Sequence, residues 1–72
     1  MMFNRMTFDE LKELPTCTFS EDGQRAYIAW FQSGIYECYH MRSDGYYYCA
    51  GSTYKLETAR KYLVDEDVEL LT

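Results

Sequence analysis

The sequence predicts a single α+β domain, with a short N-terminal helix, a three- to four-stranded antiparallel meander, and a C-terminal helix packed on one face of the sheet. Three observations lead to this prediction. The 72 residues are 47% hydrophobic and 18% aromatic, which is enough for one small core. Aromatic runs between residues 25 and 51 are divided by Ser33-Gly34 and Ser43-Asp44-Gly45, as strands are divided by turns. Helix signals flank this region on both sides.

The N-terminal helix is expected to run from about Phe8 to Leu14. Thr7 and Glu10 have the spacing of a capping box, in which each side chain accepts a hydrogen bond from the other's backbone N–H. Pro15 then ends the helix. Two turns are too short to be stable alone, so this helix must pack on the sheet. Residues 1–6 are expected to be a disordered extension, with Met1, Met2 and Met6 as candidate starts, and residues 7–72 to form the domain.

The strands and the second helix follow from local patterns. Asp22-Gly23 is a strong hairpin signal when β-forming residues flank it. The second helix carries an apolar stripe of Leu56, Ala59 and Leu63 and should end near Val64, before an acidic run. The expected strands are Thr16–Phe19, Gln24–Gln32, Ile35–Arg42 and Tyr46–Gly51, with Val68–Leu71 as a short edge strand.

Turn lengths predict which residues share a face of the sheet. If Ser33-Gly34 and Asp44-Gly45 are two-residue loops, Ala29 lies opposite Cys38 and His40 lies opposite Cys49. Small residues at the centre of that face allow helix two to pack there. The first face would carry Tyr27, Ala29, Phe31, Tyr36, Cys38, His40, Tyr47, Cys49 and Gly51. The second face would carry Ala26, Ile28, Trp30, Ile35, Glu37, Tyr39, Met41, Tyr46, Tyr48 and Ala50.

The second face has two interpretations. If it stays uncovered, its aromatic and apolar side chains form the kind of exposed patch that marks an interface. If helix one covers it through Phe8, Leu11 and Leu14, both faces are core. Under the first interpretation, the partner-binding residues are Trp30, Tyr39, Tyr46 and Tyr48 as anchors, with Glu37 and Asp44 as charges at the rim.

No catalytic, cofactor or metal motif is present in the sequence. Cys17, Cys38 and Cys49 are odd in number and lack C-x-x-C spacing, which favours reduced, buried thiols. Cys38, Cys49 and His40 would share a face, but a fourth zinc ligand is missing and the spacing is not that of a zinc ribbon. A Cys–His nucleophile would lack an orienting acid. We therefore expect no enzyme activity, no metal and no cofactor.

Charge and composition restrict the partner. Twelve acidic and seven basic residues give a net charge of −5, which favours a protein partner with a basic surface and disfavours nucleic acid. No apolar run approaches the roughly 18 residues of a membrane span, and residues 1–6 lack the apolar segment of a signal peptide. The expected location is cytoplasmic, without membrane association.

Three classes of function fit these features. The first is a protein-binding module. The second is a nucleic-acid reader, because three strands followed by a helix resemble AP2 and integrase arm-binding domains; here, however, only Arg25 and Arg42 flank a face that also holds Glu37. The third is a homodimer whose aromatic face pairs with itself.

A short acidic chain with a sheet and a Leu56-x-x-Ala59 helix also resembles small phage-encoded inhibitors, including anti-CRISPR proteins and the phage inhibitor of host RNA polymerase. The resemblance implies an inhibitor that acts in the host bacterial cytoplasm. Its acidic side chains would occlude the nucleic-acid-binding surface of a host protein. The alternative is a small domain with an ordinary solvated acidic surface.

Overall fold

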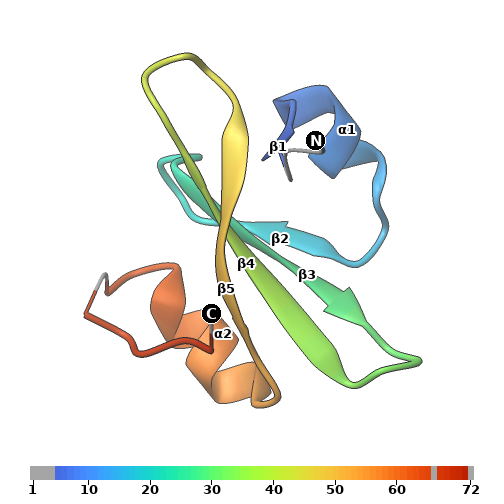
Figure 1. Ribbon diagram of the computed structural model, residues 1–72. Coiled ribbons are helices and arrows are strands. Elements are labelled where there is room, and N and C mark those ends of the chain that lie inside the picture. Colours follow the sequence, from blue (N-terminus) through green and yellow to red (C-terminus); the bar gives the residue numbers. More distant parts are fainter. Residues whose placement is uncertain (1–4, 66, 72) are drawn as a thin grey trace.

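The computed structural model describes residues 5–65 and 67–71, which form an α+β domain with a curled five-stranded sheet (Figure 1). All neighbouring strands are antiparallel, in the order β1-β5-β4-β3-β2. The two helices lie on opposite faces of this sheet. The elements are β1 (Arg5–Met6), α1 (Phe8–Glu13), β2 (Cys17–Phe19), β3 (Arg25–Trp30), β4 (Ile35–Met41), β5 (Tyr47–Thr53) and α2 (Leu56–Tyr62).

The α+β class is confirmed, but the sheet includes a strand, β1, that was not predicted. Arg5 and Met6, expected within the N-terminal extension, form β1 and pair with Tyr48 and Tyr47 of β5. Residues 1–4 of that extension lie outside the described residues. A two-residue strand has too little periodicity to be recognised in a sequence, because strand signals depend on alternation over four or more residues.

Helix α1 begins with the predicted capping box. The Thr7 hydroxyl accepts a hydrogen bond from the Glu10 amide at 3.1 Å, and Glu10 Oε1 accepts one from the Thr7 amide at 2.8 Å. The helix ends at Glu13, and Leu14 is extended, as the residue before a proline usually is. Leu11, which is fully buried, attaches the helix to the sheet.

The loop between β3 and β4 has four residues, Phe31 to Gly34, rather than the two predicted. The Trp30 carbonyl accepts hydrogen bonds from the amides of Ser33 and Gly34, so the strands separate after Trp30 rather than after Gln32. Ala29 therefore pairs with Tyr36 instead of Cys38. Because the register moves by two residues, each side chain on β3 and β4 keeps its predicted face.

The hairpin of β4 and β5 differs from the prediction in a way that moves side chains to the other face of the sheet. Its loop has three residues, because the Arg42 amide bonds the Tyr46 carbonyl and Gly45 takes a left-handed conformation with φ of 85°. The extra residue shifts the start of β5 by one position, so that Tyr47 and Cys49 join the face of Ile28 and Tyr39. A β-bulge at Ala50 then restores the predicted pairing of Cys38 with Gly51.

The core consists of two clusters, one on each side of the sheet. Ala26, Ile28, Tyr39 and Tyr47 pack with Leu11 of α1. On the other side, Tyr27 and Cys38 pack with Ala59 and Tyr62 of α2. Helix α2 thus lies on the Cys38 face, as predicted. Its main contacts are Ala59 and Tyr62, however, whereas Leu56, one of the predicted contacts, is 37% exposed.

The C-terminal segment returns to β5 but does not form the strand predicted at Val68–Leu71. A single antiparallel bridge joins Leu71 to Ser52 through two backbone hydrogen bonds of 2.7 and 2.8 Å. Gly51 allows this approach, because a Cβ atom there would lie 2.6 Å from the Leu71 carbonyl oxygen and 2.9 Å from Leu70 Cβ. The close approach of the C-terminal segment therefore explains why a glycine lies inside β5.

Candidate functional site

The six residues predicted to bind a partner do not form one surface. Trp30 and Glu37 lie near the β3–β4 turn, whereas Asp44, Tyr46 and Tyr48 lie at the β4–β5 turn. The seven residues of β4 separate these two ends by roughly 20 Å, at about 3.3 Å per residue. Tyr39 lies between them in the α1-side cluster and is only 5% exposed. Tyr39 is therefore not accessible to a partner in this structure.

Helix α1 covers the middle of the second face and leaves its end open. Leu11 packs in the same buried cluster as Ile28 and Tyr39, as expected if helix one covers this face. Six residues of helix span only about 9 Å, at 1.5 Å per residue. Trp30, two residues beyond Ile28 on the same strand, is 43% exposed. Both interpretations of this face are thus realised, at different positions along the strands.

The open end carries two adjacent exposed aromatic residues, Trp30 and Phe31, with exposed fractions of 43% and 77%. The indole N–H of Trp30 donates to Glu37 Oε1 at 2.6 Å, which holds the ring against the sheet. An open hollow of about 560 Å³ lies beside the two rings. It is lined by Leu14, Pro15, Thr16, Ala29, Trp30, Phe31, Gln32 and Ser33. Most of these side chains are apolar, so the hollow suits an apolar group.

A second hollow, of about 350 Å³, shares Pro15, Thr16, Ala29 and Phe31 with the first. It lies on the α2 side of the sheet, which carries Tyr27 and Tyr36, and it extends to the edge strand β2. Thr18, Tyr27, Tyr36 and Leu56 complete its lining. Phe31 therefore lines both hollows. We call the surface formed by Leu14, Pro15, Trp30, Phe31 and Leu56 the aromatic surface.

Sequence reasoning identified only part of the aromatic surface. Trp30 was predicted as an anchor, but Phe31 was placed on a strand face that helix two was expected to cover. Pro15 was interpreted only as the residue that ends the first helix. The available signal for Phe31 was its position two residues before Ser33-Gly34, because residues in and beside turns lie at the surface.

The β4–β5 turn holds a second cluster, whose polar groups bind one another. The Arg5 and Arg42 guanidinium groups lie 4.3 and 4.2 Å from the ring centroids of Tyr46 and Tyr48. Asp44 accepts hydrogen bonds from the Tyr48 hydroxyl at 2.5 Å and from the Tyr46 amide at 3.0 Å. The hydrogen bond from Tyr48, followed by that from the Tyr46 amide, lowers the pKa of the Asp44 carboxyl. This cluster joins β1 to the hairpin.

Replacing Tyr48 with phenylalanine should raise the pKa of Asp44 toward the usual value of about 3.9. The hydroxyl is the largest cause of the lowered pKa, because its hydrogen bond favours the ionised carboxylate. A carboxyl with a lowered folded-state pKa stabilises the fold above its unfolded pKa and loses that contribution as the pH falls through the folded pKa. NMR titration of the Asp44 carboxyl carbon measures the shift, with Asp22 as the internal control. An unchanged pKa in the variant would contradict the assigned hydrogen bond.

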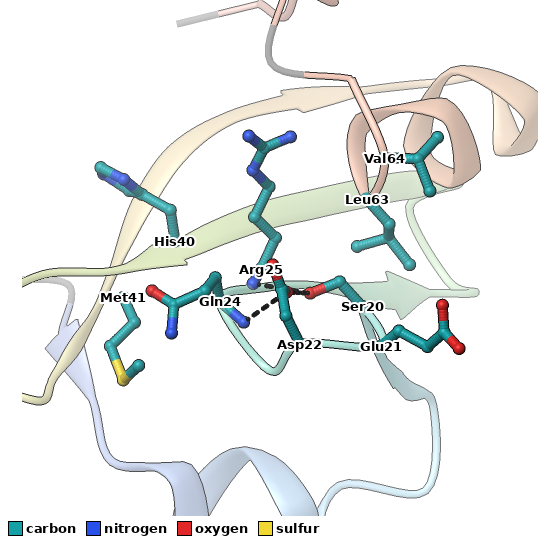
Figure 2. A pocket seen from close by; sticks show the side chains of 9 residues that line it. All are labelled: Ser20, Glu21, Asp22, Gln24, Arg25, His40, Met41, Leu63 and Val64. Atoms are coloured by element: carbon teal, nitrogen blue, oxygen red, sulfur yellow. Dashed lines mark hydrogen bonds between the residues drawn. The ribbon is translucent and has the colours of Figure 1, made fainter.

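A third hollow, of about 590 Å³, lies between the β2–β3 turn, β4 and the end of α2 (Figure 2). Three of its polar side chains, those of Ser20, Asp22 and Arg25, already have partners. Asp22 Oδ1 accepts hydrogen bonds from the Ser20 hydroxyl at 2.7 Å and from the Gln24 amide at 3.0 Å. Arg25 Nη1 donates to the Tyr62 carbonyl at 2.9 Å. Because the Ser20 hydroxyl donates to Asp22 rather than to His40, these residues are not arranged as a nucleophile and base.

The cysteine thiols lie in or beside the two core clusters. Burial raises the pKa of the Cys38 thiol to about 12 and that of the Cys17 thiol to about 11, so both are protonated near neutral pH. The shift in β5 register moves Cys49 to the α1-side cluster, away from the Cys38 face. Within residues 5–65 and 67–71, no group of three or more Cys, His, Asp or Glu side chains has a geometry that would hold a metal ion.

The aromatic surface thus combines exposed rings with two hollows, whereas polar groups at the other two places bind one another. No helix within the described part of the chain is both long and apolar enough to span a membrane. No protein-family model matches this sequence, and comparisons with curated proteins and with solved structures found no match.

Proposed function

We propose that this protein is a non-enzymatic protein-binding module and that it binds its partner through the aromatic surface. One observation carries the proposal: Trp30 and Phe31 are adjacent, exposed and flanked by two largely apolar hollows. Exposed apolar patches of this kind mark interaction sites on soluble proteins. Trp is also the residue type most often found as an energetic hot spot in interfaces.

The Trp30 side chain is held before binding, which reduces the entropy lost when a complex forms. Glu37 holds the Trp30 indole through a 2.6 Å hydrogen bond, and the Trp30 carbonyl closes the turn that carries Phe31. A side chain that is already ordered loses less conformational freedom on binding, by about 0.5 to 1.5 kcal/mol for each group. The short hairpin thus presents an ordered Trp30 ring and fixes the backbone position of Phe31 beside it.

The net charge of −5 favours a partner with a basic surface, because opposite charges speed association. The more specific form of the proposal is an inhibitor that covers the nucleic-acid-binding surface of a host protein, as implied by the resemblance to small phage inhibitors. Nucleic acid itself is a weaker candidate. Arg5 and Arg42 lie over their own tyrosines beside Asp44, so the rings of Tyr46 and Tyr48 are already covered on one side.

Affinity purification from the native host, followed by binding measurements on the captured protein, tests the proposal. The double variant Trp30→Ala/Phe31→Ala should weaken binding by roughly 30-fold or more, since hot-spot truncations cost about 2 kcal/mol or more. Tyr54→Ala is the matched control, because Tyr54 is an aromatic side chain, 64% exposed, outside the aromatic surface. Circular dichroism confirms that each variant is folded, and nuclease treatment removes capture through RNA or DNA. Undiminished binding by a folded double variant would refute the proposed surface.

A further inference from the structure

The outer edge of β2 has backbone groups that face away from the sheet. The Thr16 carbonyl accepts a hydrogen bond from the Ala29 amide at 3.1 Å, and the Ser20 amide donates to the Arg25 carbonyl at 2.8 Å. Thr16, Thr18 and Ser20 therefore direct their backbone groups toward β3, and the alternate residues Cys17 and Phe19 direct theirs outward. The Cys17 amide donates to the Leu14 carbonyl at 3.2 Å. The Cys17 carbonyl and both Phe19 groups remain along an edge that no other described strand covers.

Apart from its short length, this edge lacks the usual protection against strand pairing. Exposed edges commonly carry charged side chains, proline or a bulge, which prevent another chain from pairing. The segment Thr16 to Phe19 contains no charge and no proline, and its pairing with β3 is regular. At the opposite edge, β1 carries Arg5, and β5 is joined by Leu71. The three-residue length of β2 limits unspecific pairing but leaves room for one short segment.

The aromatic surface lies directly beside this edge. Both hollows are lined by Pro15 and Thr16, and the smaller one also by Thr18, so both extend to the β2 side of the sheet. Residues opposite each other in an antiparallel pair share a face. A side chain opposite Thr18 on an added strand would therefore lie on the face where Tyr27, Phe31 and Tyr36 line the smaller hollow. Strand addition and apolar anchoring would then act together, as in other cases of strand-addition binding.

Charges at the two ends of the edge indicate which occupant fits. Glu13 lies four residues before β2 in the chain, and Glu21 and Asp22 follow β2 after Ser20. A second copy paired antiparallel about Thr18 would bring Glu21 of one copy toward the Glu13 end of the other. Each copy also carries a net charge of −5. Like charges brought together in this way oppose self-pairing, whereas a segment with basic ends would complement both ends of the edge.

We infer that the partner binds by adding an extended segment to the outer edge of β2. This segment places a large apolar side chain toward the smaller hollow and carries basic residues at its ends. This inference rests on the proposed function, because it specifies how the same surface is used. Backbone hydrogen bonds to Phe19 and Cys17 provide the pairing, and the hollow selects the apolar side chain.

The probe for this inference is the heptapeptide Arg-Thr-Val-Tyr-Val-Thr-Lys, followed by NMR and amide hydrogen exchange. At saturation, exchange of the Phe19 amide should slow by at least 10-fold, whereas the Phe31 amide, which lies outside the new ladder, should show no comparable change. The same peptide with Glu at both ends should bind at least 10-fold more weakly. A peptide with Pro in place of the first Val, the residue opposite Phe19, should not protect the Phe19 amide, because it lacks the N–H that would pair with the Phe19 carbonyl. Absence of Phe19 protection with the basic peptide would overturn the inference.

A backbone variant separates this inference from the proposed function. N-methylation of the Phe19 amide, introduced by joining synthetic segments at Cys17, removes the outward donor and leaves every side chain unchanged. The methylated chain should be folded and should lose peptide binding. If Trp30→Ala/Phe31→Ala abolishes partner binding but the methylated chain binds that partner normally, the proposed function holds and strand addition is refuted. Concentration-dependent dimerisation with Phe19 protection in the absence of peptide would instead identify a second copy as the occupant and overturn the inference.

Discussion

Replacing Tyr39 with alanine should lower the free energy of unfolding by about 3 to 5 kcal/mol, the range for a large aromatic side chain truncated in a core. Tyr39 is 5% exposed and packs with Ala26, Ile28 and Tyr47. Its removal leaves a cavity that the close-packed strands cannot fill. A domain of this size has a total stability of roughly 4 to 11 kcal/mol, so the substitution should remove from about a quarter to all of it.

Urea denaturation followed by circular dichroism measures this effect. Tyr54→Ala is the matched control and should change stability by less than about 0.5 kcal/mol, because Tyr54 is 64% exposed. In the wild-type chain, the Tyr39 pKa is an independent test of burial, since burial raises it above the usual value for tyrosine. A change below about 1 kcal/mol for Tyr39→Ala would show that the side chain is not core. Tyr39 would then again be available to anchor a partner.

Replacing Leu11 with alanine should cost about 2 to 5 kcal/mol and should release α1 from the sheet. Leu11 is the one fully buried side chain of a six-residue helix, and a helix of that length has little stability of its own. The capping box of Thr7 and Glu10 satisfies the first turn but cannot replace the lost contact with Ile28 and Tyr39. Release of α1 would expose that apolar face to water.

Two measurements report this change. Urea denaturation gives the loss of stability, and binding of the dye ANS under native conditions should rise because apolar surface becomes accessible. Lys12→Ala is the control on the same helix and should affect neither, because Lys12 is exposed. Unchanged ANS binding together with wild-type stability in Leu11→Ala would mean that α1 does not cover the second face. The Ile28 and Tyr39 region would then become a second candidate surface.

Elements controlled by short-range chemistry could be predicted from the sequence. The capping box at Thr7 is an example, because its hydrogen bonds connect residues three positions apart. The faces of β3 and β4 were also predicted correctly, although the loop was two residues longer than expected. An error of two in register keeps each side chain on its face, because the period of a strand is two. Hydrophobic alternation thus predicts which face of the sheet a side chain occupies more reliably than which residue it pairs with on the next strand.

The face of β5 could not be predicted, because it depends on backbone geometry that leaves no clear trace in the residue types. A three-residue loop ending at Gly45 moves Tyr47 and Cys49 to the α1 side, and the bulge at Ala50 reverses the shift for Gly51. Both strand faces are rich in tyrosine, so alternation could not reveal a shift of one residue. Burial of Tyr47 beside Tyr39 therefore became evident only from the folded sheet.

The sequence by itself determined the α+β class, the capped first helix and the acidic charge, because these follow from local spacing and composition. It also indicated Trp30 as a candidate anchor for a partner. Only the tertiary structure decided that Tyr39 is core, that Phe31 is exposed and that no other described strand pairs with the outer edge of β2. The first depends on how far a short helix reaches across the sheet, the second on the four-residue β3–β4 loop, and the third on the order of the strands. All three are set by contacts within the folded sheet, which no local pattern records.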